Sequence, residues 1–217
     1  MNSSSLSRDD ILRFLADAPA VAVSACLLGI PCRYDGKAKN ASHALLNFLL
    51  SRPSLCSSVQ DEPERRIRGY SELRKAFQKA EEREDVHPLG ADPLLRTLLP
   101  KGVFPICPEI FGGLSCPRLP ADFFGGSGED LLHGSAVLIN RAGEDVTSAF
   151  LLGAQSALSI AEIAGVTAAV LKEGSPSCGV GRVQCNGVKI SGSGVTSCLF
   201  QKASIRRFTE EDLSPIL

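Results

Sequence analysis

The stretch AVAVSAC, residues 20–26, decides the fold. It is made of small and β-branched residues without a charge, which is typical of a strand buried on both faces. Pro19 precedes it and ends an amphipathic segment, residues 7–18, that Ser7 is placed to cap as a helix. The chain therefore begins with a helix that is followed directly by a buried strand.

Three more apolar runs predict strands, with helical spacing between them. The strands are GVFPIC at 102–107, GSAVLIN at 134–140 and VTAAVLK at 166–172. The predicted helices cover 41–50, about 71–84 and 145–165. Strands that alternate with helices predict an α/β fold with a mostly parallel sheet.

Residues 51–100 differ in character from the rest of the chain. The stretch DEPERRIRGYSELRKAFQKAEERED, residues 61–85, is dense in both charge signs, and Ser71 is placed to cap a helix that ends near Glu84. We expect a charged, partly helical insertion at about 51–100, with a solvated helix, within a single α/β domain that spans 1–217. A lid or a partner surface is the alternative.

The composition narrows the class of protein. The chain has 217 residues and a formal net charge of −1. It therefore lacks the excess of basic residues that is typical of proteins that bind nucleic acids or membranes. No run is long and apolar enough to span a bilayer, and the start MNSSSLSRDD lacks the features of a secretory signal. We therefore expect a cytoplasmic protein, in which the eight cysteines are thiols or metal ligands rather than disulfides.

Three of these cysteines follow predicted strands. Cys26 and Cys107 end the first and second strands, and Cys178 lies six residues past the fourth, in LKEGSPSCGVGR. Ligands of open α/β sheets bind beyond the carboxyl ends of the strands, so the three thiols are expected at one edge of the sheet. Three thiolates suit an iron–sulfur cluster with one open iron, or a zinc ion with an open position. Three separate buried thiols are the third possibility.

A carboxylate and several glycines stand beside these cysteines. Glu109 lies two residues after Cys107 in CPEIFGGL, which places a carboxylate at the expected site. Loop glycines let a backbone approach a ligand closely, although ordinary turn glycines are the alternative. These are Gly112, Gly113, Gly179 and Gly181.

Three motifs together resemble the thiouracil desulfurase family: VSACLLGIPCRYDG, CPEIFGGLSCPRLPAD and LKEGSPSCGVG. The resemblance implies a compact α/β fold, which we expect as a three-layer Rossmann-like domain. It also implies a [4Fe–4S] cluster held by Cys26, Cys107 and Cys178, with the fourth iron open to the substrate's sulfur. By the same resemblance, Glu109 is the catalytic carboxylate and Ser175 the assisting hydroxyl.

The chain also departs from the family pattern. The 51–100 insertion is extra, Glu173 and Gly174 replace more usual residues, and Asp122 stands where glutamate is common. These changes bear on the choice of substrate and its access to the site.

The remaining candidate residues lie near the motifs. Arg33, Asp35 and Ser177 are candidates to bind substrate, although Arg33 and Asp35 are equally well read as a structural pair. Cys32, Cys116 and Cys185 are expected to be lining or buried thiols rather than cluster ligands.

The resulting prediction is an enzyme that removes sulfur from a thiolated pyrimidine base or nucleoside without redox chemistry, giving the oxo product and sulfide. A non-catalytic metal- or cluster-binding module is one alternative, and a desulfurase of thiolated RNA is another. The near-zero net charge counts against RNA. The expected partner is therefore a small thiolated base or nucleoside, and the oligomeric state is not predicted.

Overall fold

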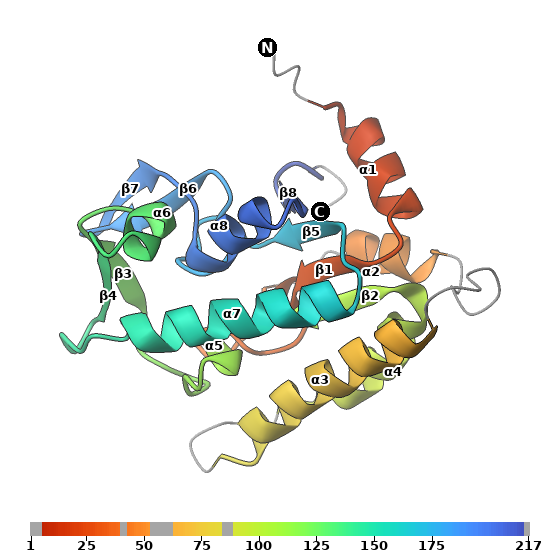
Figure 1. Ribbon diagram of the computed structural model, residues 1–217, viewed down its shortest axis with the longest axis horizontal. Coiled ribbons are helices and arrows are strands. Elements are labelled where there is room, and N and C mark those ends of the chain that lie inside the picture. Colours follow the sequence, from red (N-terminus) through yellow and green to blue (C-terminus); the bar gives the residue numbers. More distant parts are fainter. Residues whose placement is uncertain (1–5, 40–42, 53–62, 84–88, 215–217) are drawn as a thin grey trace.

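The structure is a computed structural model that describes residues 6–39, 43–52, 63–83 and 89–214. Its first sheet has the strand order β2-β1-β5-β8, and all of its pairs are parallel (Figure 1). The strands are β2 (Val103–Ile106), β1 (Val21–Ser24), β5 (Ala168–Leu171) and β8 (Arg206–Thr209). Every residue of β1, β2 and β5 is buried, as their apolar composition predicts.

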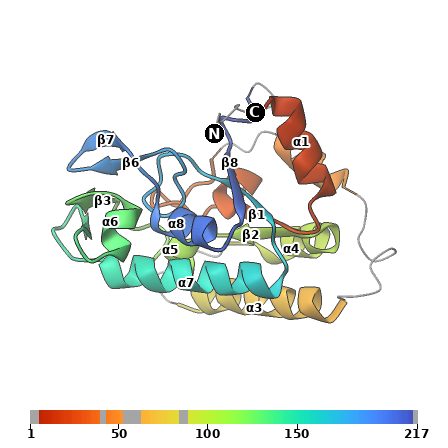
Figure 2. The same ribbon diagram turned by 45° about the horizontal axis from the view of Figure 1, so that its top comes forward.

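Helices cover both faces of this sheet, which makes the three-layer α/β arrangement. Figure 2 shows α7 (Thr147–Ile163) and α3 (Pro63–Glu81) side by side below the sheet and α1 (Arg8–Asp17) above it. The Ser7 side chain caps α1 as predicted and accepts a hydrogen bond from the Asp10 N–H. The other helical elements are η1 (Ala25–Leu28), α2 (His43–Leu50), α4 (Asp92–Leu98), η3 (Leu99–Lys101), α5 (Pro108–Phe111), α6 (Gly128–Leu132) and α8 (Val195–Lys202).

A second sheet lies beside the first, with the strand order β4-β3-β6-β7. It consists of β4 (Val137–Asn140), β3 (Ala121–Phe124), β6 (Arg182–Cys185) and β7 (Val188–Ser191). The strand predicted at 134–140 is present as β4, but it lies in the second sheet and pairs antiparallel with β3. The physical reason is its alternation: Leu138 is buried and Val137 exposed, the pattern of a sheet with one open face.

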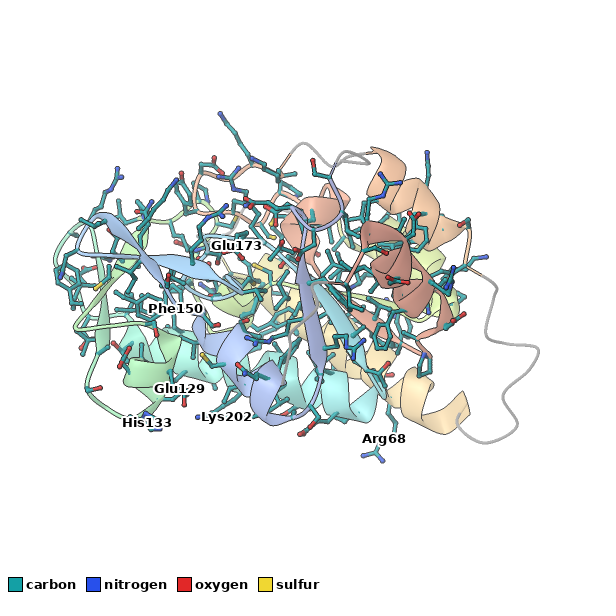
Figure 3. The ribbon with its side chains drawn as sticks, turned by 90° about the horizontal axis from the view of Figure 1, so that it is seen from above. Arg68, Glu129, His133, Phe150, Glu173 and Lys202 are labelled. Atoms are coloured by element: carbon teal, nitrogen blue, oxygen red, sulfur yellow. The ribbon has the colours of Figure 1, made fainter. Side chains whose placement is uncertain are left out.

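Helix α7 packs against both sheets. Phe150 and Ala154, near its start, belong to the apolar cluster under the second sheet, and Ile160, near its end, belongs to the main core. Phe150 lies under the second sheet in Figure 3. One helix thus contributes to both apolar clusters of the described residues.

Helix α5 meets α7 at unusually short range. A Cβ on Gly112 would lie 1.9 Å from the Ala149 carbonyl oxygen, and one on Gly153 would lie 1.8 Å from that of Pro108. Gly112 therefore serves helix packing, a role that neither alternative considered from the sequence includes. The contact fixes the short helix α5, which directly follows Cys107.

The described part of the 51–100 segment is more deeply packed than predicted. Helix α3 begins at Pro63, so Ser71 lies inside the helix and does not cap it, and Glu84 lies outside the described residues. Leu73 and Phe77 of α3 and Leu95 of α4 are buried in the main core. The helix is solvated on one face only, because its apolar residues recur at helical spacing.

None of the helices in the described ranges has both the length and the apolar character that crossing a membrane requires.

The packing of α3 gives a stability prediction. Phe77 is 2% exposed and its ring stacks edge-to-face on Phe111 of α5, with centroids 5.3 Å apart. Phe77→Ala should lower the free energy of unfolding by about 3–5 kcal/mol, the usual cost of emptying a buried aromatic site. Lys79→Ala, on the exposed face, should change it by about 0.5 kcal/mol or less in the same denaturant titration. If Phe77→Ala lowered the free energy of unfolding as little as Lys79→Ala does, α3 would contribute little to the stability of the core.

Candidate functional site

A cavity of about 580 Å³ opens at the carboxyl ends of β1, β2 and β5. One wall comes from loops that follow these three strands, and the other from the second sheet. The register aligns Val21 with both Val103 and Ala168, so the three strands end at the same level. The cavity thus occupies the position where open α/β sheets bind ligands.

The three predicted cysteines all line this cavity. Cys26 lies in η1 directly after β1, Cys107 is the residue before α5 at the end of β2, and Cys178 lies in the loop after β5. Their exposures are 8%, 8% and 5%, so each sulfur has little contact with water. Residues that are 70 or more positions apart in sequence are brought to one place by the parallel register.

The loop that carries Cys178 is held by a buried carboxylate. Glu173 is 6% exposed, and its two oxygens accept hydrogen bonds from the N–H groups of Val180, Gly181 and Arg182. Figure 3 shows Glu173 between the two sheets. This departure from the family pattern thus has a structural role, because it closes the loop around Cys178.

Ser175 organises the inside of the same loop. Its Oγ accepts hydrogen bonds from the N–H groups of Ser177 and Cys178, both at 3.2 Å. The oxygen's acceptor capacity is therefore used, and the hydroxyl hydrogen is available to donate. Because Ser175 also lines the cavity, that donor is available to a ligand there.

Cys32 is a buried thiol that lines the cavity, as the sequence analysis expected, and it lies among the three predicted ligands. Its hydrogen bonds with the Cys107 and Cys26 thiols, together with burial, raise its pKa well above the ordinary value. The hydrogen bond from Cys32 lowers the pKa of Cys107, burial opposes this, and the Arg118 cation lowers it further. Cys32 is therefore a protonated neighbour that favours a thiolate at Cys107.

Burial raises the pKa of the Cys178 thiol well above its ordinary value. A hydrogen bond from Ser24 opposes this, and negative charge on Cys26 and Cys107 adds to it. Ser24 is itself fixed, since its Oγ accepts the Lys172 N–H at 2.9 Å. Without a compensating positive charge nearby, Cys178 therefore keeps its proton.

Glu109 forms a buried ion pair with Arg118, a residue that sequence reasoning did not single out. Arg118 Nε and Nη2 lie 2.7 Å and 2.5 Å from Glu109 Oε2. Burial alone would lower the pKa of Arg118, but the charges of Glu109 and Cys107 raise it above its ordinary value. Nothing in periodicity or spacing could have found the pair, because Arg118 reaches Glu109 across a loop.

The three predicted substrate-binding residues have different positions. Arg33 lines the cavity, and its Nη2 lies 3.7 Å from Oδ2 of Asp35. Asp35 is not among the lining residues, because its Oδ1 accepts the Lys37 N–H within a tight turn. Ser177 does not line it either: it is 2% exposed, and its carbonyl accepts the Thr196 N–H beneath the loop. Direct substrate contact by Asp35 or Ser177 is thus not supported by the geometry.

The wall from the second sheet contributes residues that the sequence reasoning largely missed. Asp122, already noted as a departure from the family pattern, comes from β3, Gln184 from β6 and Lys189 from β7, while Arg141 follows β4. Their common signal is the alternation of these strands, in which every second residue faces away from the core.

The comparisons with known proteins agree with this geometry. The family described as 2-thiouracil desulfurase matches residues 77–212. The chain belongs to this family. A curated relative, the uncharacterized protein YbbK of Bacillus subtilis, is 46% identical over 114 residues, which cover 51% of this chain and 76% of YbbK.

A solved structure with a similar fold is the [4Fe-4S]-dependent thiouracil desulfidase TudS. It is 30% identical, with a TM-score of 0.53, and the match covers 91% of this chain and 94% of TudS. The predicted α/β fold and family are thereby confirmed. The matched family segment contains Cys107, Glu109, Ser175 and Cys178 and begins after Cys26.

For this desulfurase family member, the role of Glu173 gives a prediction. Glu173→Gln replaces one acceptor oxygen by a donor, so a partly buried N–H of residues 180–182 loses its partner. We expect a loss of about 1–3 kcal/mol in the free energy of unfolding and faster amide exchange at Val180 and Arg182. Glu211→Gln breaks a half-exposed ion pair with Arg182 and should cost about 1 kcal/mol or less. Unchanged exchange at 180–182 in Glu173→Gln would show that the carboxylate does not hold the loop.

Proposed function

We propose that this chain removes the sulfur of a small thiolated pyrimidine base or nucleoside and replaces it with oxygen, without net redox change. The observation that carries the proposal is the meeting of Cys26, Cys107 and Cys178 with Glu109 and Ser175 in one cavity. The family match and the printed activity of TudS support the reaction class.

We further propose that Cys26, Cys107 and Cys178 hold a [4Fe–4S] cluster. The donor set fits this group, because the thiols are buried together and the negative charges of Cys26 and Cys107 disfavour a thiolate at Cys178 unless a cation compensates them. Among the described residues, no three Cys, His, Asp or Glu side chains are grouped closely enough to hold a single metal ion. The preference for a cluster over zinc rests on the family match and on the [4Fe-4S] dependence in the name of TudS. When bound, it supplies a thiophilic Lewis acid for the substrate's sulfur.

Glu109 is the group that moves the proton. Its carboxylate lines the cavity with the side chain 16% exposed, so a water molecule that enters with the substrate can reach it. In the described part of the chain its Oε1 has no recorded hydrogen-bond partner, which leaves one oxygen to accept a proton from water. Replacement of C=S by C=O consumes one water and releases hydrogen sulfide, so the proton taken from water can leave with the sulfur.

Ser175 orients the substrate or the attacking water. Its oxygen already accepts two backbone N–H groups, so its hydroxyl can only donate into the cavity. A donor fixed in this way favours a group that gains negative charge during the reaction. Arg33 and the wall of the second sheet are then available to the rest of the substrate.

Activity is tested by replacing Glu109 with an uncharged residue of the same shape. Glu109→Gln can still accept a hydrogen bond from Arg118 but cannot take a proton. We expect sulfide release from 2-thiouracil by anaerobically purified protein to fall by about 10² or more at unchanged iron content. Glu162→Gln, an exposed acid on α7, should release sulfide as the unaltered protein does. A wild-type rate in Glu109→Gln would exclude the carboxylate as the base.

The ligand set is tested by iron content. Single changes to Ser at Cys26, Cys107 and Cys178 should each remove most of the iron and the visible absorbance of the cluster. The same change at Cys32 should leave iron near its normal level, because serine retains a hydrogen-bond donor toward Cys107. Cys185→Ser, outside the cavity lining, is the matched control. Loss of iron in Cys32→Ser as large as in Cys107→Ser would make Cys32 a ligand.

A further inference from the structure

The guanidinium of Arg118 is bonded through all three of its nitrogen atoms. Nε and Nη2 both contact Glu109 Oε2, and Nη1 donates to the carbonyl oxygens of Cys32 and Ser115, each at 3.1 Å. The Arg118 side chain is 7% exposed. An arginine with this many fixed bonds has one orientation, because its fork is rigid and planar.

The anchors of Arg118 belong to the loops that surround the cysteines. Cys32 follows η1 and Ser115 precedes Cys116, whose thiol contacts the Pro31 carbonyl at 3.0 Å. The Arg118 N–H also donates to the Tyr34 carbonyl at 2.8 Å. The guanidinium is thus held by the two loops on either side of it, independently of Glu109.

The consequence for Glu109 is a difference between its two oxygens. Both contacts from Arg118 go to Oε2, whereas Oε1 has no recorded partner among the described residues. The carboxylate is also fixed from its backbone, because the glycine contact between α5 and α7 prevents α5 from shifting. With the helix and one oxygen both fixed, only one position is left for Oε1.

We propose that Arg118 is a positioning residue that presents Oε1 of Glu109 to the reacting water. This inference rests on the proposed function, since it assigns Arg118 a part in the proton step of that reaction. Arg118 acts through Glu109 and has no contact of its own with the substrate in this role. A lysine cannot replace it, because a single ammonium group cannot contact Oε2 and both carbonyls in the same geometry.

The test is a double-mutant cycle on kcat with anaerobically prepared, cluster-containing protein. Arg118→Met should lower kcat for 2-thiouracil by about 10²-fold, the scale of a misplaced catalytic group, while KM changes far less. Arg118→Met added to Glu109→Gln should cause little further loss, because the residue acts only through the carboxylate. If Arg118→Met lowers kcat by the same factor in the unaltered chain and in Glu109→Gln, the proposal is overturned.

Two further variants separate positioning from general stability. Arg118→Lys keeps the charge but not the fork, and its kcat should stay well below normal; full recovery would overturn the proposal. Arg52→Met removes another buried arginine, which bonds the carbonyls of Ala16, Ala18 and Lys101 away from the cavity. It should lower the unfolding temperature but leave kcat unchanged. A fall in kcat there equal to that in Arg118→Met would show that stability alone is measured.

A second measurement does not depend on activity. In metal-free protein, Arg118→Met should lower the unfolding temperature more in the normal chain than in Glu109→Gln, because the pair is coupled. Additive shifts of the unfolding temperature would contradict the pairing of Arg118 with Glu109. If Arg118→Met loses its cluster, so that kcat cannot be compared, this measurement decides the question. If the unaltered protein binds iron but releases no sulfide from 2-thiouracil, the proposed function fails while this coupling can still hold.

Discussion

The parallel pairing of β1 with β2 and β5 is the constraint on which the site depends. Parallel strands in register end at the same edge, so the loops that follow them share one small volume. Cys26, Cys107 and Cys178 each follow one of these strands, and a one-residue slip of any strand would turn its last side chain to the other face. Full burial of all three strands on both faces fixes the register.

Charge inside the cavity is arranged so that each buried group has a compensating neighbour. Glu109 is paired with Arg118, Glu173 is bonded to backbone N–H groups, and Lys172 pairs with Glu210. Cys178 differs, because burial and negative charge on Cys26 and Cys107 oppose its ionisation, whereas Cys32 and Arg118 favour a thiolate at Cys107. A buried charge without a partner is costly, which is consistent with the proposed cationic group among the sulfurs.

The sequence predicted the parts of the fold with a strong local signal. Two signals were sufficient to place the three cysteines at one edge of the sheet. They are the apolar runs of β1, β2 and β5 and the helical spacing of apolar residues along α7. The second sheet was missed because its short strands are half-exposed, and β8 because Arg206 and Arg207 interrupt any apolar run. The hydrogen bonds of Cys32 and the role of Arg118 could not be predicted, since these contacts join loops whose paths depend on tertiary packing. Asp35 and Ser177 lie close in sequence to lining residues, but the Asp35 carboxylate accepts a hydrogen bond within its own turn and the Ser177 side chain is buried beneath the loop.

The division of the cavity between two sheets has a consequence for how this protein can change over evolutionary time. The first wall is made of loops that follow three fully buried strands, where substitutions disturb the core. Asp122, Gln184 and Lys189 sit on the open face of a separate sheet with its own apolar cluster. Drift at these positions can alter which molecules enter without moving the thiols or the carboxylate. Relatives can therefore diversify in ligand preference while their reactive centre stays fixed.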